Sequence, residues 1–167
     1  MNRTILMILV IMLVAAGGLF AQLAGQIVLT GTVPEILNIT VTPEPIAATL
    51  DLTATVNDLK IGTVTEFSNK LAGYTLTLES ASAVAAGSAI ATFEGVDVSN
   101  TDTMAYTIKY GGAAVTLVSG SAVVSDTTTK TAGTGAANDV AISYDGAAAF
   151  LYEDSYTDTL TFTIAAK

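Results

Sequence analysis

The sequence predicts an all-β fold, an antiparallel sandwich of about nine short strands. From Gln26 onward, apolar and polar residues alternate with a period of two, in runs rich in Thr, Val, Ile, Tyr and Phe. Proline, glycine, asparagine and aspartate separate these runs at short intervals. Beyond the N-terminal region, the sequence has no window of about ten residues with the period of about 3.6 that marks an amphipathic helix.

The N-terminal 21 residues have the layout of a secretory signal peptide. An unbroken apolar run from Ile5 to Ala16 follows Arg3 and precedes small, weakly polar residues. A membrane-spanning helix needs about 20 apolar residues, which is more than this run supplies. We therefore expect residues 1–21 to be removed during export; a retained anchor is the alternative.

Cleavage after Ala21, or alternatively after Ala24, leaves a single domain that we assign to residues 22–167. The removed segment carries Arg3 and no acid, so the formal charge changes from −9 to −10, with five lysines against fifteen acids. Nucleic acid and anionic lipid need clustered Lys and Arg. The charge therefore argues against both as partners.

The expected strands follow one another along the chain at residues 27–33, 36–42, 50–56, 59–65, 74–78, 89–94, 104–110, 115–117, 139–144 and 156–164. Gly111-Gly112 predicts a tight hairpin, because both glycines can adopt a positive φ. The alanine-rich residues 81–87 and 147–149 are interpreted as loops. Residues 125–138 contain few apolar side chains and predict a long mobile loop.

The composition excludes most kinds of catalytic residue. The chain has no cysteine and no histidine, which excludes a thiol nucleophile, a lipid-modified cysteine and a cysteine-based metal site. A serine or threonine nucleophile would then need a lysine or a carboxylate as its base. The lysines all fall at polar-face, loop or terminal positions, namely Lys60, Lys70, Lys109, Lys130 and Lys167. We expect no enzyme activity and no cofactor.

The acids form two local clusters, Glu153-Asp154 with Asp158, and Asp97 with Asn100 and Asp102. Paired carboxylates could serve a glycosidase, but adjacent residues on a strand point to opposite faces. The second cluster lacks the spacing of a twelve-residue calcium loop and lacks its glycine. An Asx-rich turn is the interpretation that we favour there. The sequence thus predicts neither a catalytic residue nor a metal ligand.

Three segments together resemble chaperone-usher fimbrial subunits and the related spore-coat-U-like secreted domains. Residues 59–64, followed after a polar gap by residues 73–78, are similar to the middle of those domains. Residues 27–33 resemble their first strand, and residues 156–164 resemble their closing strand. The resemblance implies an immunoglobulin-like antiparallel sandwich whose missing strand is lent by a periplasmic chaperone and then by the next subunit.

The resemblance implies that the chain is a non-enzymatic structural subunit of a cell-surface fibre or coat, and that it passes through the periplasm and an outer-membrane usher. Its partners would be copies of itself or related subunits, with no nucleic acid and no small-molecule substrate. Either residues 22–33 are the donor strand, or the domain completes its own sheet. The alternatives from other classes are a small outer-membrane β-barrel and a secreted carbohydrate-binding or adhesive module.

Two sets of residues follow as candidates for assembly. The candidate donor strand presents Ile27, Leu29, Gly31 and Val33 on one face. The candidate closing strand beside the groove presents Tyr156, Leu160, Phe162 and Ile164 on one face, with threonines on the other.

Overall fold

The structure is a computed structural model that describes residues 25–167. The expected signal peptide, residues 1–21, and both expected cleavage sites lie outside the described residues. The chain divides into two units, Met1–Val33 and Pro34–Lys167, and the first is described from Gly25 onward. Residues 25–33 carry no secondary structure and all are exposed, so the strand expected at residues 27–33 is not formed. A strand requires a neighbour for its backbone N–H and C=O groups, and residues 25–33 have no pairing partner in this structure.

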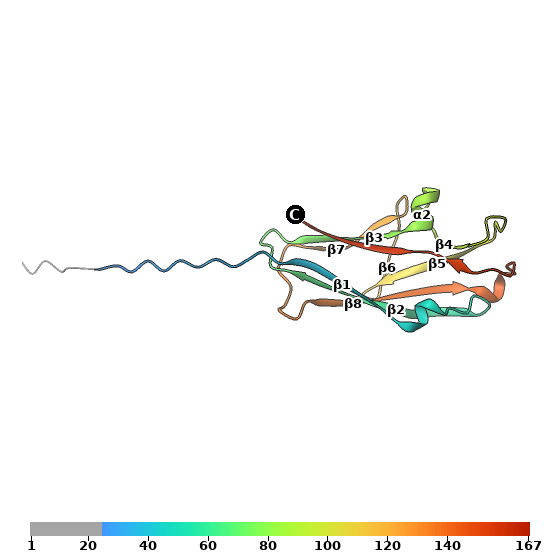
Figure 1. Ribbon diagram of the computed structural model, residues 1–167, viewed down its shortest axis with the longest axis horizontal. Helices are drawn as coiled ribbons and strands as arrows, with labels where there is room; N and C mark the ends of the chain where they lie inside the picture. The colour runs from blue at the N-terminus through green and yellow to red at the C-terminus, as the bar shows by residue number, and fades with distance from the viewer. Residues whose placement is uncertain (1–24) are drawn as a thin grey trace, which may run out of the picture. The chain divides into compact units, whose positions relative to one another are not determined.

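Residues 34–167 form an all-β antiparallel sandwich, which confirms the predicted fold class (Figure 1). The strands are β1 (Leu37–Pro43), β2 (Thr55–Ser68), β3 (Tyr74–Ser80), β4 (Ala91–Gly95), β5 (Thr103–Tyr110), β6 (Ala113–Ala114), β7 (Ser121–Thr127), β8 (Ala136–Asp145), β9 (Tyr156–Thr157) and β10 (Leu160–Ala166). Between them lie the short helices η1 (Pro45–Ala48), α2 (Ala81–Ala86) and η2 (Gly146–Ala148). Of the helices in residues 25–167, none has the length and apolar character needed to cross a membrane.

The strands form two sheets. The larger sheet has the order β1-β2-β8-β5-β4-β9, with β6 paired to β5, and the smaller has the order β10-β3-β7. Every strand pair is antiparallel. β1 therefore lies at one edge of the larger sheet and β10 at one edge of the smaller sheet.

The core lies between the sheets and is built by the alternation seen in the sequence. Val64 of β2, Leu76 and Leu78 of β3 and Ile142 of β8 are at most 2 % exposed. Burying an aliphatic side chain of this size stabilises a fold by about 1.5–3 kcal/mol. These central strands hold residues 34–167 together without a disulfide.

Two expected strands are shorter in the structure. Of residues 50–56, only those from Thr55 onward are in a strand, because the N–H and the hydroxyl of Thr53 both donate to Asp51 Oδ1, at 2.9 and 2.6 Å. Such a local bond competes with strand pairing. The Gly111-Gly112 turn is confirmed, with φ of 55° and 82°, but the strand after it is only β6, and residues 115–117 lie outside it.

The loop expected at residues 125–138 is shorter in the structure, because strands occupy both of its ends. β7 continues to Thr127 and β8 begins at Ala136, so the connection spans only residues 128–135. The backbone N–H of Thr131 donates to Ser68 O at 2.9 Å, which fixes this connection to the end of β2. β7 is an edge strand whose two faces are both partly exposed, so it lacks the apolar row that reveals a strand in a sequence.

The alanine-rich residues 81–87 form the helix α2 and not a loop. Ser80 caps the helix, since its Oγ accepts from the backbone N–H of Ala83 at 3.3 Å. Gly87 ends it in the left-handed conformation, with φ of 60°. Ala147 and Ala148 likewise belong to the short helix η2, and Ala149 follows it as the C-cap.

The expected strand at residues 156–164 is divided between the two sheets. Tyr156 and Thr157 form β9 and pair with β4 in the larger sheet, whereas β10 begins at Leu160 and pairs with β3 in the smaller sheet. Asp158 and Thr159 make the crossing. This crossing brings β10 to the side of the sandwich where β1 also has a free edge.

Candidate functional site

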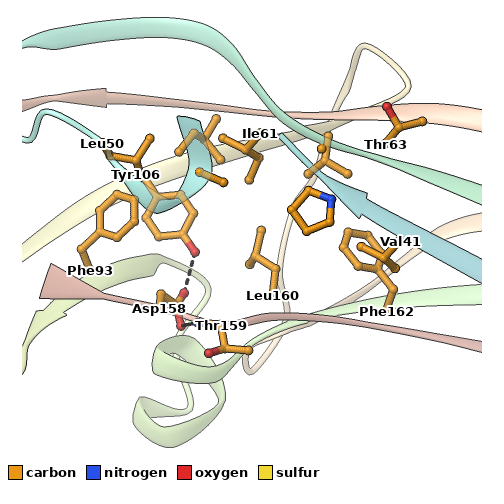
Figure 2. A pocket seen from close by; sticks show the side chains of 15 residues that line it. Val41, Leu50, Ile61, Thr63, Phe93, Tyr106, Asp158, Thr159, Leu160 and Phe162 are labelled. Carbon is orange, nitrogen blue, oxygen red and sulfur yellow. Dashed lines mark hydrogen bonds between the residues drawn. The ribbon is translucent and has the colours of Figure 1, made fainter. Parts of the chain in front are cut away.

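The candidate site is an apolar cavity of about 270 Å³ inside the sandwich, on the side where β1 and β10 lie (Figure 2). These two edge strands approach each other but do not pair. Val41 lines the cavity from β1, and Leu160 and Phe162 line it from β10. Ile61 of β2 and Ile142 of β8 form its inner wall. We call this cavity, together with the free edges of β1 and β10, the groove.

The groove is bordered by apolar side chains that the sandwich does not fully cover. Leu160, Phe162 and Ile164 point inward from β10 and are only half-buried, and Val41 is 47 % exposed. Their neighbours on β3 are fully buried, although Leu78 is directly opposite Phe162 and Leu76 is opposite Ile164. A row of large apolar side chains that faces inward yet is only half-buried indicates that another element can cover it.

One polar group closes the groove at the crossing between β9 and β10. The carboxylate of Asp158 accepts hydrogen bonds from Tyr106 Oη at 2.5 Å and Ser80 Oγ at 2.6 Å, and the first of these is drawn in Figure 2. The backbone N–H groups of Ser82 and Thr159 also donate to it. Burial alone would raise the pKa of Asp158, but these four donors outweigh it and hold the pKa below its ordinary value. Burial and the nearby carboxylate raise the pKa of the Tyr106 phenol.

A second polar cluster lies deeper between the sheets, around Glu66 of β2, which is 1 % exposed. Tyr74 Oη donates to its carboxylate at 2.6 Å, Ser125 Oγ at 2.9 Å and Asn138 Nδ2 at 3.1 Å, and Tyr110 Oη also donates to it. All four donors are neutral. Their hydrogen bonds compensate for the hydration that the carboxylate loses when it is buried.

The tyrosines of this cluster are poor acids. Burial, reinforced by the hydrogen bond to Glu66, raises the pKa of Tyr74 to about 12, and the same two causes raise the pKa of Tyr110. The ring of Tyr110 lies 6.1 Å from the ring of Phe162, measured between centroids. The Glu66 cluster therefore supports one wall of the groove, and its neutral donors suit it to a structural role.

The predicted closing-strand residues are only partly brought together. Leu160 and Phe162 line the groove, and Ile164 continues the same row toward the end of β10. Tyr156 does not belong to this row, because it lies on β9 in the other sheet. Its hydroxyl accepts from Asn100 Nδ2 and donates to the backbone O of Tyr152, both at 2.9 Å. Tyr156 thus fixes a loop and does not border the groove.

The predicted donor residues are all exposed. The exposed fractions of Ile27, Leu29 and Val33 are 88, 90 and 85 %, and a Cβ placed on Gly31 would have no atom within 4 Å. Exposed apolar side chains in regular alternation are costly in water and gain most from a partner surface.

The charged residues that the sequence singled out have structural partners. Asp97 accepts from Ser99, as expected for an Asx turn, and Asp102 accepts from the backbone N–H of Tyr152 at 2.8 Å. Residues 25–167 hold no group of three or more His, Cys, Asp or Glu side chains arranged around a metal position. Glu153 and Asp154 lie in a loop, so the argument from strand alternation does not apply to them. Asp154 instead accepts from Asn100 Nδ2 and the N–H of Asp97, both at 2.9 Å, and these bonds lower its pKa.

Four of the five lysines singled out in the sequence form ion pairs at the surface. Lys60 pairs with Asp139 at 2.9 Å, Lys70 pairs with Glu35 at 2.5 Å and Lys109 pairs with Asp58 at 2.7 Å. Lys167 also pairs with Asp126. The side chains of these four lysines are between 28 and 43 % exposed. Exposed pairs of this kind contribute about 1 kcal/mol or less to stability.

Sequence reasoning missed Glu66 and Tyr106. A signal for Glu66 was present, because it stands two positions after Val64 and two before Ser68, on the face of β2 that the alternation turns inward. Its donors come from β3, β5, β7 and β8, and no local pattern predicts that meeting.

Neither a scan against models of known protein families nor a search of curated proteins gives a match to this chain.

Proposed function

We propose that this protein is a non-enzymatic structural subunit of a cell-surface fibre or coat, assembled by β-strand addition. In this assembly, residues 22–33 of one copy, or of a related subunit, enter the groove between β1 and β10 of another copy. Export through the periplasm, a chaperone and an usher belong to the same proposal, since they follow from the resemblance to fimbrial subunits.

The observation that carries the proposal is the half-buried row of β10. Its apolar side chains face the interior beside the fully buried row of β3, and β10 has no strand on its other side. The row is explained if a further strand covers it in the assembled protein. A free strand edge also offers unpaired backbone N–H and C=O groups, which is the usual basis for strand addition.

The candidate donor matches the groove in length and pattern. Residues 27–33 and β10 each comprise seven residues, which span about 23 Å when extended. On a strand, the odd-numbered side chains of Ile27, Leu29 and Val33 point to one side, and Gly31 leaves a gap in this apolar row. Burying each of the three apolar side chains would contribute about 1.5–3 kcal/mol.

The groove is narrow in the unassembled subunit, because β1 and β10 approach each other. An incoming strand therefore has to part them. It also has to cover Val41 and Phe162, which the present packing leaves partly exposed. Strand insertion thus breaks the weak contact between the edges of β1 and β10. In its place, the inserted strand pairs with the backbone of both edges and buries apolar side chains on both.

The test compares two substitutions on the donor. In the unassembled chain, Gly31→Leu meets no atom within 4 Å, so folding should be unaffected. In the groove it would overpack the site, which costs about 1–3 kcal/mol. Thr32→Leu is the matched control, since its side chain would point away from the groove. We expect electron microscopy of material sheared from the native host to show antibody-labelled fibres for the wild type and for Thr32→Leu, and a loss of fibres for Gly31→Leu.

A second measurement detects donation directly. Residues 34–167 should bind a synthetic peptide of residues 22–33, and the peptide should raise the melting temperature as any ligand of the native state does. The proposal is wrong if no fibres are found and the peptide does not bind. A stable monomer in which Gly31→Leu lowers the melting temperature would show instead that the segment completes its own subunit.

A further inference from the structure

The two ends of the sandwich differ in their surface chemistry. One end, which we call the acidic end, comprises residues 49–53, 94–102 and 146–155. The other, which we call the lysine end, comprises residues 34–36, 68–73, 126–135 and 167. The hydrogen bond from Asn69 N to Ile36 O and that from Lys167 N to Gly73 O hold the lysine end together. Figure 1 shows the connections around β9 and those after β2 and β7 at opposite ends of the strands.

The loops of the acidic end are held in a fixed arrangement. Val96 N donates to Ser155 O at 2.8 Å, and Tyr152 N donates to the carboxylate of Asp102 at 2.8 Å. The carboxylate of Asp154 joins the same two loops through its bonds from residues 97 and 100. Loops with this many mutual bonds present a preformed surface, which lowers the entropy cost of docking.

That preformed surface carries large apolar side chains in full contact with water. Phe150 and Val98 are fully exposed, and Tyr152 is 73 % exposed. Each stands on one of the two bonded loops. Exposed aromatic residues on a fixed surface are typical of a protein interface. The lysine end has its own exposed apolar residue, Leu71, which is 98 % exposed.

The acidic end and the lysine end differ in charge, and this difference determines which surface each end can dock on. The acidic end has six carboxylates, from Asp51, Glu94, Asp97, Asp102, Glu153 and Asp154, and no lysine or arginine, for a formal charge of −6. The lysine end has three lysines against Glu35 and Asp126, for a formal charge of +1. The acidic end therefore repels a second copy of itself and attracts the weakly cationic lysine end, and this favours a head-to-tail contact between copies.

Strand direction allows the same pairing of ends in one of the two possible orientations of the donor. β1 starts at the lysine end, where Leu37 pairs with Ser68, and β10 finishes there, where Ala166 pairs with Tyr74. A donor that runs antiparallel to β10 leaves the groove at the acidic end, and Pro34 of the donating copy follows directly after Val33. The lysine end of that copy then meets the acidic end of the acceptor. A donor running the other way would bring two lysine ends together.

We infer that the acidic end docks on the lysine end of the next copy, with Phe150, Val98 and Tyr152 packing around Leu71 and with Lys130 facing the carboxylates. This inference rests on the proposed function, and it adds an end-to-end contact to the donated strand. The contact is heterologous, so it extends an open fibre and does not close a ring of two. It also makes the direction of the donor a consequence of surface charge.

The apolar part is tested by Phe150→Ser, with Val123→Ser as the matched control. Val123 is a residue of β7, is 60 % exposed and belongs to neither end. We expect Phe150→Ser to lower the yield of sheared fibres about tenfold, which is the change expected from losing the burial of one aromatic side chain. Val123→Ser should leave the yield unchanged. Both variants should bind the peptide of residues 22–33 with the affinity of the wild type.

The charged part is tested by reversal and restoration. Lys130→Glu should lower the fibre yield, and adding Glu153→Lys to the same chain should restore it, because every contact in the fibre then has the reversed charges. Unchanged yields for Phe150→Ser and Lys130→Glu, with fibres and peptide binding intact in the wild type, would overturn the end-to-end contact and leave the strand addition standing. Loss of peptide binding in Phe150→Ser would also overturn it, since the residue would then act through the groove. Absence of both fibres and peptide binding in the wild type would overturn the proposed function itself.

Discussion

β3 and β10 are paired neighbours with the same apolar alternation, yet their inward side chains have different environments. Leu78 has no exposed surface, and Phe162 directly opposite it on β10 remains half-buried. β3 has a strand on each side, whereas β10 has one on a single side. Side-chain burial in a sheet therefore depends on the lateral neighbours as well as on the opposing sheet. The half-buried row of β10 thus lies at the edge of its sheet, where the strand has a neighbour on one side only.

The largest effect should appear at alkaline pH, because buried tyrosines hold both the covered interior, at Glu66, and the groove, at Asp158. Folding raises the pKa of Tyr74 from 10.0 to about 12 and also raises those of Tyr106 and Tyr110. A raised pKa contributes stability that is fully present below the unfolded value and is lost as the pH rises toward the folded value. We expect the free energy of unfolding to be constant up to about pH 9 and to fall steeply between about pH 10 and 12.

This prediction is checked by denaturant unfolding at a series of pH values, together with the ultraviolet absorbance of tyrosinate. Tyr110→Phe removes one of the buried phenols and should make the alkaline loss less steep. Three tyrosines that titrate near their ordinary pKa in the native protein would contradict the buried Glu66 and Asp158 clusters.

The substitutions Leu78→Ala on β3 and Phe162→Ala on β10 compare the two strands, and Leu78→Ala is considered first. Leu78→Ala leaves a cavity in the covered interior and should lower the free energy of unfolding by about 2–5 kcal/mol. The measurement is urea unfolding of residues 22–167 as a monomer. A loss below about 1 kcal/mol would mean that the interior of β3 is not tightly packed.

Glu66→Gln tests the polar part of the same interior. Glutamine keeps the size but replaces one acceptor oxygen with a donor group, which then faces hydroxyl and amide donors. Leaving such groups unsatisfied should cost about 1–3 kcal/mol. Ser125→Ala, which removes one donor at the margin of the cluster, is the milder control. Equal effects of the two variants would contradict the central position assigned to Glu66.

Phe162→Ala should be less costly than Leu78→Ala in the monomer, about 1–2 kcal/mol, because the ring is only half-buried there. In the assembled fibre the same change should be more costly, since a donated strand would bury the ring. The check is the unfolding free energy of the monomer against the dissociation temperature of the fibre. A loss in the monomer equal to that of Leu78→Ala would show that the row of β10 is already covered.

The smallest effect is expected on the outer face of β10. Thr161→Ala alters an exposed side chain that points away from both the groove and the core, and it should change stability by less than about 0.5 kcal/mol. It should also leave fibres intact. A loss of fibres would place the functional surface on the outer face of β10 and not in the groove.

Sequence reasoning recovered the features that depend on local alternation. It predicted the fold class and the inward rows of β3 and β10, because each row repeats every second residue. It missed β7, whose two faces are both partly exposed, and the six-residue helix α2, which is set by its cap at Ser80 and by Gly87. Short elements of this kind are determined by their ends and their contacts more than by a period.

The candidate site was predictable only in part, for a related reason. The alternation that identified Leu160 and Phe162 also included Tyr156, since the threonines of the other face continue on both sides of Asp158. The carboxylate of Asp158 is held by Ser80 and Tyr106, residues far away in the sequence, and that contact marks where the chain changes sheets. The groove itself arises from the order of strands in two sheets, which depends on non-local pairing.

The central claim is that β10 lacks a neighbour that residues 22–33 of another copy supply, and hydrogen exchange of the β10 backbone tests it most directly. Alternate N–H groups of β10 face away from β3 and have no strand to pair with. We predict that these amides in Leu160–Ala166 exchange rapidly in residues 34–167 alone, and that they become strongly protected when the peptide of residues 22–33 is added. The peptide with Gly31→Leu should give no protection. Slow exchange of every β10 amide without the peptide, or exchange that the peptide leaves unchanged, would contradict the account.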